Sequence, residues 1–596
     1  MIGFGDVREG GFSALDVALA ESFAAVWPDA DEDALVLAAL ASWAVGLGHS
    51  CFSAELLAGR EAQDAFGNDA RIARAIDRMR EGALSKAPFL GPPEAGLPLV
   101  HAHGLLWLRR YWRYEREIDA SLHARAGARL ADLDPAAVRA VLDRLLPPDD
   151  PGETDWQRVA AVIGLRSLLT VICGGPGTGK TFTVLRMLAL LQHFAASPLR
   201  IALAAPTGKA AQRLSESMRA GLSTLPLSDA ERESLPSEAM TVHRLLGFRP
   251  QSVQPARDAS RPLDLDVLVV DECSMVDLPL MAKLLRALKP QTRLILLGDP
   301  DQLPAVENGA VLATLAACNP DNAFADDVRA WIAASAGAQV PGTARASAIA
   351  RTVVHLERPR RFGGESGIAR LVRAVRSADS HRVFEALAAG GDVHWSEHPL
   401  RSDSAAALAH LRGAHAGLLD ARSPEQALAA LARYRVLCAL REGPNGVAGL
   451  NAIIAEALHG ARGANPHHPG RPILITSNDA ALGLFNGDVG VMFSERDGAP
   501  VRAWFMRSDG SAHAFAPAQL PPHESAYAMT VHKAQGSEFE TVELVLPPAA
   551  HVLLTRAWLY TAVSRARSRL VLHATRESLA AALAGESRRI NGLSFD

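Results

Sequence analysis

Short, mostly apolar runs alternate with helix-like segments in the middle of the chain. The runs lie at residues 168–172, 201–205, 267–270 and 294–297. Buried parallel strands with helices on both faces have this pattern, because apolar side chains cover both sides of each strand. We therefore predict that residues 155–297 form an α/β core around a parallel sheet.

The same alternation resumes from Val353 onward. Its strand-like runs lie at residues 435–440, 526–529, 542–546 and 570–573. This pattern predicts a second, related α/β core. The second core carries no phosphate-binding loop of its own, so we expect it to bind no ATP of its own.

A different pattern interrupts the second core at about residues 471–519. Short apolar runs at 473–476, 488–493 and 501–506 are separated by Asp–Gly pairs at 497–498 and 509–510. Asp–Gly pairs between short apolar runs are typical of hairpin turns. The pattern predicts a small antiparallel β insertion that resembles an SH3-like barrel.

The N-terminal part is helical in pattern and leads into an aromatic, basic segment. From Phe12 to Leu84 apolar residues recur at helical spacing, which predicts a small helical domain for packing or partner docking. Residues 105–115 interleave aromatic residues with arginines. Such a segment can stack on bases, or it can be a strand-to-helix element whose aromatic side chains pack between domains. We favour the second interpretation.

These patterns divide the chain into four regions. Residues 146–152 are rich in proline, aspartate and glycine, which break regular structure, so we place a boundary there. The predicted regions are a helical N-terminal partner-docking domain at 1–110, a linker at 111–152, a first core at 153–345 and a second core at 346–596.

Composition narrows the class of protein. A chain of 596 residues exceeds what one hydrophobic core usually serves, so we expect three or four domains. The net charge of −4 gives no global basic field, so any nucleic-acid contact must come from a local groove. Five widely spaced cysteines without a C-x-x-C pair argue against a disulfide framework and against a zinc or iron–sulfur site. The cysteine pattern favours a reduced, cytoplasmic protein. We expect no membrane association, because no apolar run could span a bilayer.

A glycine-rich loop follows the first strand of the first core. Residues 173–181 read CGGPGTGKT and satisfy the pattern G-x-x-x-x-G-K-[ST]. Small residues let successive backbone N–H groups surround phosphate oxygens at a helix N-terminus. Lys180 would reach the β- and γ-phosphates, and Thr181 would bind Mg²⁺. The alternative, a glycine turn that fits the pattern by chance, is disfavoured by the flanking strand and helix. The predicted nucleotide contacts are Gly174, Gly175, Pro176, Gly177, Thr178, Gly179, Lys180 and Thr181.

Further polar residues follow the other predicted strands. Asp271 and Glu272 come directly after a buried strand, where α/β sheets bind their ligands. Asp271 could bind Mg²⁺, and Glu272 could contact the attacking water. Alternatively, two such acids can cap a helix. Gln302 follows the next strand and can contact the γ-phosphate or its water, unless it belongs to an ordinary proline-bounded turn. Gln157, upstream of the loop, can pair with the adenine edge or lie on the surface.

Taken in order, these residues resemble the motif series of superfamily 1 DNA helicases. The similar segments are 174–181, 205–211, 241–247, 271–275, 298–303, 530–539 and 560–566. Within that superfamily, residues 361–368 and 437–451 resemble the RecD family, the alpha chains of RecBCD helicase–nucleases (exodeoxyribonuclease V). The likeness runs from about residue 156 to 575 and is weaker in the N-terminal region.

The resemblance implies a fold and a mode of action. It implies two RecA-like P-loop NTPase cores, ATP and Mg²⁺ in the cleft between them, and 5′-to-3′ movement along single-stranded DNA. Arg361 and Arg565 of the second core would neutralise charge that develops on the transferred phosphoryl group. The arginines at 358, 360 and 361 lie close together, so the identity of the first catalytic arginine stays open between them. Cys273 stands where a smaller residue is usual.

The resemblance also implies a DNA track and protein partners. The implied DNA contacts are Pro206, Thr207, Thr241, His243, Thr530, His532 and Lys533. Gln535 and Glu538 are expected to couple this track to the nucleotide. RecB-like and RecC-like chains would complete a heterotrimer that processes duplex ends for recombinational repair, with the nuclease centre on a partner chain.

Two rival interpretations remain. The first is a stand-alone superfamily 1 helicase similar to the longer RecD-like proteins, although their extended N-terminal region is missing from this sequence. The second is a nucleotide-regulated scaffold whose N-terminal helices hold partners. DNA-stimulated ATP turnover distinguishes a motor from a scaffold.

Overall fold

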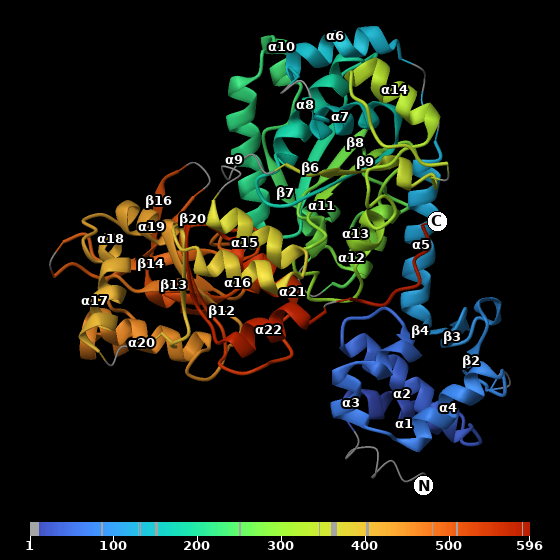
Figure 1. Cartoon of the computed structure of the whole chain (residues 1–596), viewed down its shortest axis with the longest axis horizontal. Helices are drawn as coiled ribbons and strands as arrows, with labels where there is room; N and C mark the ends of the chain where they lie inside the picture. Colours follow the sequence, from blue (N-terminus) through green and yellow to red (C-terminus); the bar gives the residue numbers. More distant parts are fainter. Residues whose placement is uncertain are drawn as a thin grey trace.

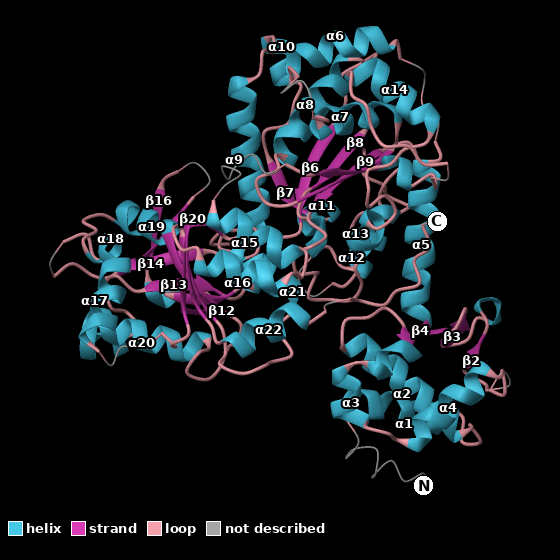
Figure 2. Ribbon diagram, in the orientation of Figure 1, coloured by secondary structure: helices cyan, strands magenta, loops and turns pink. Residues whose placement is uncertain are grey.

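The computed structural model describes residues 11–84, 87–128, 130, 133–148, 153–249, 252–344, 346–358, 366–400, 404–479, 481–496, 498–507, 510–586 and 588–595. In Figure 1 the first α/β core lies above the N-terminal domain, and the second α/β core lies to the left of both. Parallel strands run through the middle of each core and helices cover them (Figure 2). The predicted α/β fold class with two cores is confirmed.

Core 1 is built on a six-stranded, fully parallel sheet with the order β10-β5-β9-β8-β6-β7. Its strands are β5 (Leu169–Gly174), β6 (Ile201–Ala205), β7 (Ala239–Thr241), β8 (Val267–Val270), β9 (Arg293–Gly298) and β10 (Val353–Leu356). Its helices are α7 (Trp156–Arg166), α8 (Lys180–His193), α9 (Gly208–Thr224), α10 (Asp229–Glu233), α11 (Val242–Leu246), α12 (Leu278–Arg286), α13 (Val311–Ala316) and α14 (Asp326–Ala336).

Both faces of this sheet are buried, which explains the continuous apolar runs. Leu268 and Val270 of β8 pack in one hydrophobic cluster with α12 and α13, whereas Val267 and Val269 pack in another with α7 and α8. Successive side chains of a strand point to opposite faces, so a strand covered on both sides needs apolar residues at every position.

The strand β10 corrects one boundary of the prediction. The sequence predicts that the second core begins at residue 346. In the structure, Val353–Leu356 pairs in parallel with β5 and forms the edge of the first sheet. A run of apolar residues predicts a strand without saying which sheet edge it joins. Core 1 therefore extends to at least Leu356.

Core 2 is built on a five-stranded parallel sheet with the order β11-β20-β19-β12-β18. Its strands are β11 (Val393–Ser396), β12 (Tyr434–Cys438), β18 (Ala528–Thr530), β19 (Phe539–Val545) and β20 (Ala566–His573). Its helices are α15 (Gly367–Arg376), α16 (Ser380–Ala388), α17 (Ala405–Ala414), α18 (Ala416–Leu419), α19 (Pro424–Arg433), α20 (Val447–His459), α21 (Arg556–Val563) and α22 (Arg576–Ala584).

The predicted β insertion forms a separate antiparallel sheet with the order β16-β15-β14-β13-β17. Its strands are β13 (Pro472–Ile475), β14 (Val489–Phe493), β15 (Arg502–Met506), β16 (Ala512–Phe515) and β17 (His523–Ser525). The sheet reaches Ser525, beyond the predicted limit at 519, because β17 pairs with β13. Asp497 and Asp509 of the predicted turns lie outside the described residues. The SH3-like character stays a prediction.

The N-terminal domain combines the predicted helices with four short strands, of which the sequence predicts only the one in the aromatic, basic segment. Its helices are α1 (Ala14–Val26), α2 (Glu32–Gly46), α3 (Arg60–Phe66) and α4 (Ala70–Arg80). Its strands are β1 (Phe52–Ser53), β2 (Leu90–Gly91), β3 (Leu99–Ala102) and β4 (Leu105–Leu108). These strands have two to four residues each, too few to produce a recognisable alternation.

The aromatic, basic segment is a strand followed by a helix, as favoured. β4 leads directly into α5 (Arg109–Ala126), and Trp107 and Tyr111 are buried in the cluster that joins this region to core 1. The span 111–152, predicted as a linker, holds most of α5 and all of α6 (Pro135–Leu145). α5 packs against α12, and α6 packs against α8 and α14. We therefore propose that this span belongs structurally to core 1.

Two features bear on the class of protein. Across the described ranges, no helix combines the length and the apolar character that crossing a bilayer requires. All five cysteines fall within the described part of the chain, and none forms a disulfide.

Candidate active site between the two cores

The glycine-rich loop connects β5 to α8 in core 1. Gly177 and Gly179 have φ values of 77° and 87°, a backbone region that residues with a side chain rarely adopt. Gly179 is the N-cap of α8 and provides no side-chain hydrogen bond, so the first N–H groups of this helix stay available for an anion. Lys180 Nζ donates to the carbonyl oxygens of Gly174 and Gly175, at 2.6 and 3.3 Å.

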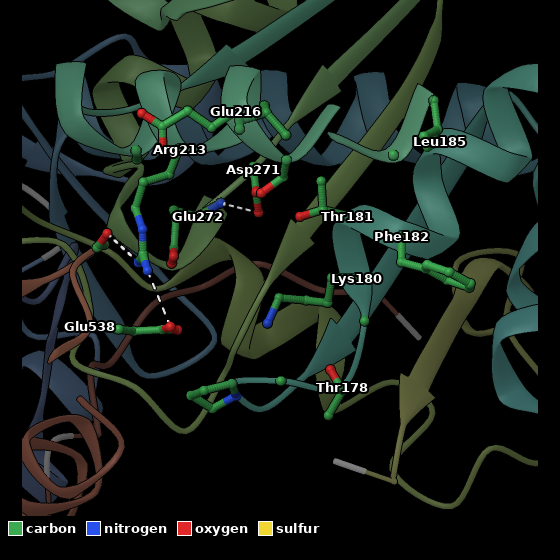
Figure 3. Close-up of a pocket in the computed structure, with 18 of the residues that line it drawn as sticks. Thr178, Lys180, Thr181, Phe182, Leu185, Arg213, Glu216, Asp271, Glu272 and Glu538 are labelled. Atoms are coloured by element: carbon green, nitrogen blue, oxygen red, sulfur yellow. Dashed lines mark hydrogen bonds and ion pairs between the residues drawn. The ribbon is translucent and has the colours of Figure 1, made fainter. Parts of the chain in front are cut away.

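A cavity of about 620 Å³ opens at this loop, and both cores line it. Residues 176–181, Asp271, Glu272 and Gln302 of core 1 line it, and Arg565 of core 2 lines it from the other side. Figure 3 shows Lys180, Thr181 and Asp271 around the same space. The structure thus brings together most of the predicted nucleotide and catalytic residues. Gly174 and Gly175 form the start of the loop and are not among the residues that line the cavity.

Asp271 and Glu272 lie directly after the carboxyl end of β8, an inner strand of the sheet, as predicted. Burial and the neighbouring Glu272 raise the pKa of Asp271 to about 6, although Lys180 opposes this shift. Glu272 has a φ of 50°, a left-handed conformation that is uncommon for a residue with a side chain. A left-handed backbone conformation at a residue with a side chain costs free energy, and such positions are typical of functional sites.

Gln302 lies in the loop that follows β9 and is 6% exposed. Its Nε2 donates to Asp299 Oδ2 at 2.9 Å. The side chain is therefore held in place by a buried carboxylate while it lines the cavity.

Arg565 follows α21 and enters the cavity from core 2. It is 2% exposed and donates to the backbone oxygens of Thr561 and Ser537, both at 3.0 Å. Burial lowers the pKa of its guanidinium, and the carboxylates of Glu272 and Glu538 oppose this shift. The other predicted catalytic arginine, Arg361, lies outside the described residues, as does Arg360. Arg358 is described and pairs with Glu153 at 3.3 Å.

Gln157 is buried behind the loop, not on the surface. Its Nε2 donates to the carbonyl oxygen of Thr178 at 2.9 Å, and its buried Oε1 has no hydrogen-bond partner within the described structure. The residue lines a second cavity of about 450 Å³, together with Trp156, Thr178 and Leu356. A buried acceptor without a partner suits a ligand that donates a hydrogen bond.

Sequence reasoning missed two arginines of the cavity. Arg213 on α9 pairs with Glu538 of core 2 at 3.1 Å and donates to the backbone oxygen of Gly536 at 2.6 Å. Arg567 on β20 pairs with the same carboxylate at 3.0 Å. Arg213 lies four residues after Lys209, so helical spacing beyond the 205–211 motif could have indicated it. Arg567 carried no such signal.

Three family models match the sequence. An AAA domain matches residues 157–308, which include the glycine-rich loop and Gln302. A UvrD-like helicase C-terminal domain matches residues 525–573, which include Arg565. The N-terminal domain of RecBCD enzyme subunit RecD matches residues 8–107.

The chain is 39% identical to the RecBCD enzyme subunit RecD of Mycolicibacterium smegmatis over 525 residues, which are 86% of this chain and 85% of that protein. It belongs to the RecD family. It is also 34% identical to the RecD subunit of Haemophilus influenzae, over 83% of this chain and 80% of that protein. The ATP-dependent RecD2 DNA helicase of Deinococcus radiodurans is 31% identical over 71% of this chain and 51% of that protein.

As a member of the RecD family, the chain is a superfamily 1 DNA helicase that uses ATP. The expected DNA contacts of core 1 lie at two helix N-termini. Thr207 caps α9 by accepting from Ala210 N at 3.2 Å, and Thr241 caps α11 by accepting from Arg244 N at 3.1 Å. Pro206 precedes the first of these caps, and the exposed ring of His243 lies 5.0 Å from that of Phe248.

The expected DNA contacts of this family on core 2 follow β18. Thr530 is 6% exposed and accepts from Lys533 N at 3.3 Å. Lys533 Nζ pairs with Glu524 at 2.6 Å, so its charge is partly neutralised in this structure. Burial, with smaller contributions from Arg441 and Arg589, lowers the pKa of His532. A neutral imidazole at this position can hold a phosphate only as a hydrogen-bond donor.

Proposed function

We propose that this chain is the 5′-to-3′ helicase and translocase subunit of a RecBCD-type helicase–nuclease, which processes duplex DNA ends for recombinational repair. The observation that carries the proposal is the cavity in which Arg565 of core 2 lies with Lys180, Asp271 and Glu272 of core 1. An ATPase site divided between two cores converts the state of the nucleotide into relative motion of those cores.

In the proposed site, core 1 binds ATP. The N–H groups of residues 174–181 surround the phosphates, and Lys180 leaves the loop carbonyls to bind the β- and γ-phosphates. Gln157 offers its unpaired Oε1 to the exocyclic amine of adenine. These contacts recognise the triphosphate and the base without any change in the sheet below them.

Thr181 and Asp271 fit a Mg²⁺ ion that accompanies the nucleotide. Asp271 and Glu272 are adjacent in the chain, and burial together with the charge of Glu272 raises the pKa of Asp271, an effect that a bound cation would oppose. Among the described residues no three His, Cys, Asp or Glu side chains gather into a metal site, so phosphate and water oxygens would supply the remaining ligands. When bound, Mg²⁺ neutralises charge on the phosphate oxygens.

Four side chains would then promote hydrolysis. Glu272 accepts a proton from the attacking water, and Gln302 orients that water. Arg565 stabilises the negative charge that develops on the transferred phosphoryl group, and Arg361 is proposed to assist from the same core. Because Arg565 comes from core 2, hydrolysis requires that the cores approach each other.

The proposed DNA track runs over Pro206, Thr207, Thr241 and His243 on core 1 and over Thr530, His532 and Lys533 on core 2. Hydroxyl groups, imidazoles and helix N-termini bind phosphates without reading the base sequence, which suits a translocase. Gln535 and Glu538 follow the core 2 part of the track and reach core 1, through the backbone oxygen of Leu303 at 3.1 Å and through Arg213. These contacts give the track a physical connection to the nucleotide site.

RecB-like and RecC-like chains are the proposed partners in a cytoplasmic heterotrimer, with the nuclease centre on a partner chain. The match of residues 8–107 to the RecD N-terminal domain supports this assignment. It also supports a docking role for the N-terminal domain. The alternative, a stand-alone helicase, is less well supported, since the RecD2 helicase is 31% identical over 71% of this chain, whereas a RecD subunit is 39% identical over 86% of it.

Strand displacement on tailed duplexes tests the proposal. Purified chain is assayed on duplexes with a 5′ or a 3′ single-stranded tail, alone and with candidate RecB-like and RecC-like chains. We expect displacement of the 5′-tailed substrate, and loss of at least about 100-fold of DNA-stimulated ATP turnover in Lys180→Gln. Lys289→Gln is the matched control, because Lys289 pairs with Asp264 on the surface of core 1. Unwinding by Lys180→Gln at the normal rate, or a preference for 3′ tails, would contradict the proposal.

A further inference from the structure

Tyr560, a residue of α21 in core 2, reaches the nucleotide site of core 1. Its side chain is 2% exposed, and its hydroxyl donates to Asp299 Oδ2 at 3.1 Å. The same hydroxyl lies 2.8 Å from the position that a Cβ atom would occupy at Gly175. Tyr560 thus contacts the phosphate-binding loop and the loop after β9 at the same time.

Asp299 connects this hydroxyl to Gln302. Asp299 is 1% exposed, and its Oδ2 accepts from both Tyr560 Oη and Gln302 Nε2. Because a carboxylate can only accept hydrogen bonds, the amide nitrogen of Gln302 must face Asp299. The amide oxygen of Gln302 and the second hydrogen of its amide nitrogen therefore remain for a group in the cavity.

Other residues of core 2 hold the same loop. Thr561 Oγ1 accepts from Leu303 N at 2.8 Å, and Gln535 Nε2 donates to Leu303 O at 3.1 Å. Arg376 pairs with Asp301 at 2.7 Å in a half-exposed contact. The loop that carries Gln302 is therefore part of core 1 in sequence, but its position depends on core 2.

We propose that Tyr560 is a positioning residue for ATP hydrolysis: through Asp299 it fixes the orientation of the Gln302 amide when the two cores are together. Movement of core 2 away from core 1 removes the Tyr560 hydroxyl from Asp299 and releases Gln302 from its productive orientation. This inference rests on the role proposed above for Gln302. It adds a connection from core 2 to Gln302 that is separate from the direct contact of Arg565 with the cavity.

Tyr560→Phe removes only the hydroxyl and tests the inference. We expect kcat for DNA-stimulated ATP hydrolysis to fall about 10-fold, while KM and the affinity for a fluorescent ADP analogue change less than about twofold. Tyr434→Phe is the matched control, because Tyr434 also donates its hydroxyl to a buried carboxylate of core 2, that of Glu543, outside the cavity. Unchanged turnover in Tyr560→Phe, or an equal loss in Tyr434→Phe, would overturn the inference.

A double-mutant cycle with Gln302→Ala separates this inference from the proposed function. If Tyr560 acts through Gln302, adding Tyr560→Phe to Gln302→Ala lowers kcat by less than about twofold. A further loss of about 10-fold in that background would show that Tyr560 acts by another route and would overturn the inference. Full turnover in Gln302→Ala alone would contradict the role proposed for Gln302. A loss in Gln302→Ala with none in Tyr560→Phe would contradict only the inference.

Discussion

At the scale of single residues, Asp271 and Glu272 lower the stability of the folded protein while no ligand is bound. Two carboxyls stand side by side at the end of a buried strand, and the pKa of Asp271 rises to about 6 because burial and Glu272 disfavour its charge. Glu272 also keeps a left-handed backbone. Such features lower stability, and we propose that binding of a cation and a nucleotide compensates for them.

Asp271→Asn is therefore expected to stabilise the nucleotide-free protein. The folded pKa of about 6 lies above the ordinary value of 3.8, so ionisation of Asp271 destabilises the fold as pH rises between these two values. At pH 7.5 the wild-type protein carries the full penalty, and we expect the variant to gain about 1–3 kcal/mol in free energy of unfolding. Denaturant unfolding at several pH values measures this. An advantage that does not shrink as pH falls from 7.5 to 5 would contradict the assignment.

Glu272→Gln should separate binding from hydrolysis. The amide keeps the shape of the side chain but cannot accept a proton from water, so kcat should fall at least about 100-fold. Nucleotide affinity should stay within about threefold, since the loop and Lys180 are unaffected. Single-turnover hydrolysis and equilibrium binding of a fluorescent nucleotide check both parts. A parallel loss of affinity would indicate that Glu272 binds the metal instead.

At the scale of elements, the segment after α22 joins three parts of the molecule. Residues 588–595 leave core 2 and end beside α5, which lies between the N-terminal domain and core 1 (Figure 1). Gly592 N donates to Glu115 Oε1 at 2.9 Å, and Ile590 N donates to His49 Nδ1 at the same distance. Leu593 and Phe595 are buried in the cluster shared with core 1. This segment fixes the N-terminal domain relative to the cores.

Gly592→Val tests the importance of that segment. A Cβ atom at this position would lie 2.3 Å from Trp107 Cζ2 and 2.9 Å from Glu115 Oε2, so it cannot be accommodated without displacement. We expect a loss of about 1–3 kcal/mol in the free energy of unfolding, the usual cost of overpacking a buried site. Ser594→Val, at an exposed position of the same segment, is the control and should change stability by less than about 0.5 kcal/mol.

For the whole molecule, the arrangement of the cores matters most, because neither core contains a complete active site. Core 1 contributes Lys180, Asp271, Glu272 and Gln302 to the cavity, and core 2 contributes Arg565. The ion pair of Arg213 with Glu538 also crosses the cleft, at 3.1 Å. We propose that ATP hydrolysis and motion of the cores are therefore parts of one process.

Arg565→Ala should lower hydrolysis far more than binding. Arginines that approach a phosphoryl group from a second body contribute about 10³-fold or more to turnover, so we expect a loss of that size in kcat with nucleotide affinity changed less than about fivefold. Arg569→Ala, on an exposed part of β20, serves as the control. Turnover within tenfold of the wild type would contradict a role for Arg565 in transition-state stabilisation.

The sequence by itself determined the local elements and the chemistry they carry. Continuous apolar runs specified the central strands of both sheets, since strands buried on both faces need apolar residues at every position. The loop around Lys180 and the acids after β8 were evident because phosphate binding restricts residue types at fixed spacing. Tertiary structure alone decided which sheet β10 joins, where residues 588–595 pack, and how Tyr560, Arg213 and Arg567 meet the site. These contacts join segments far apart in the chain, and their pairing depends on packing of the whole molecule, which no local pattern encodes.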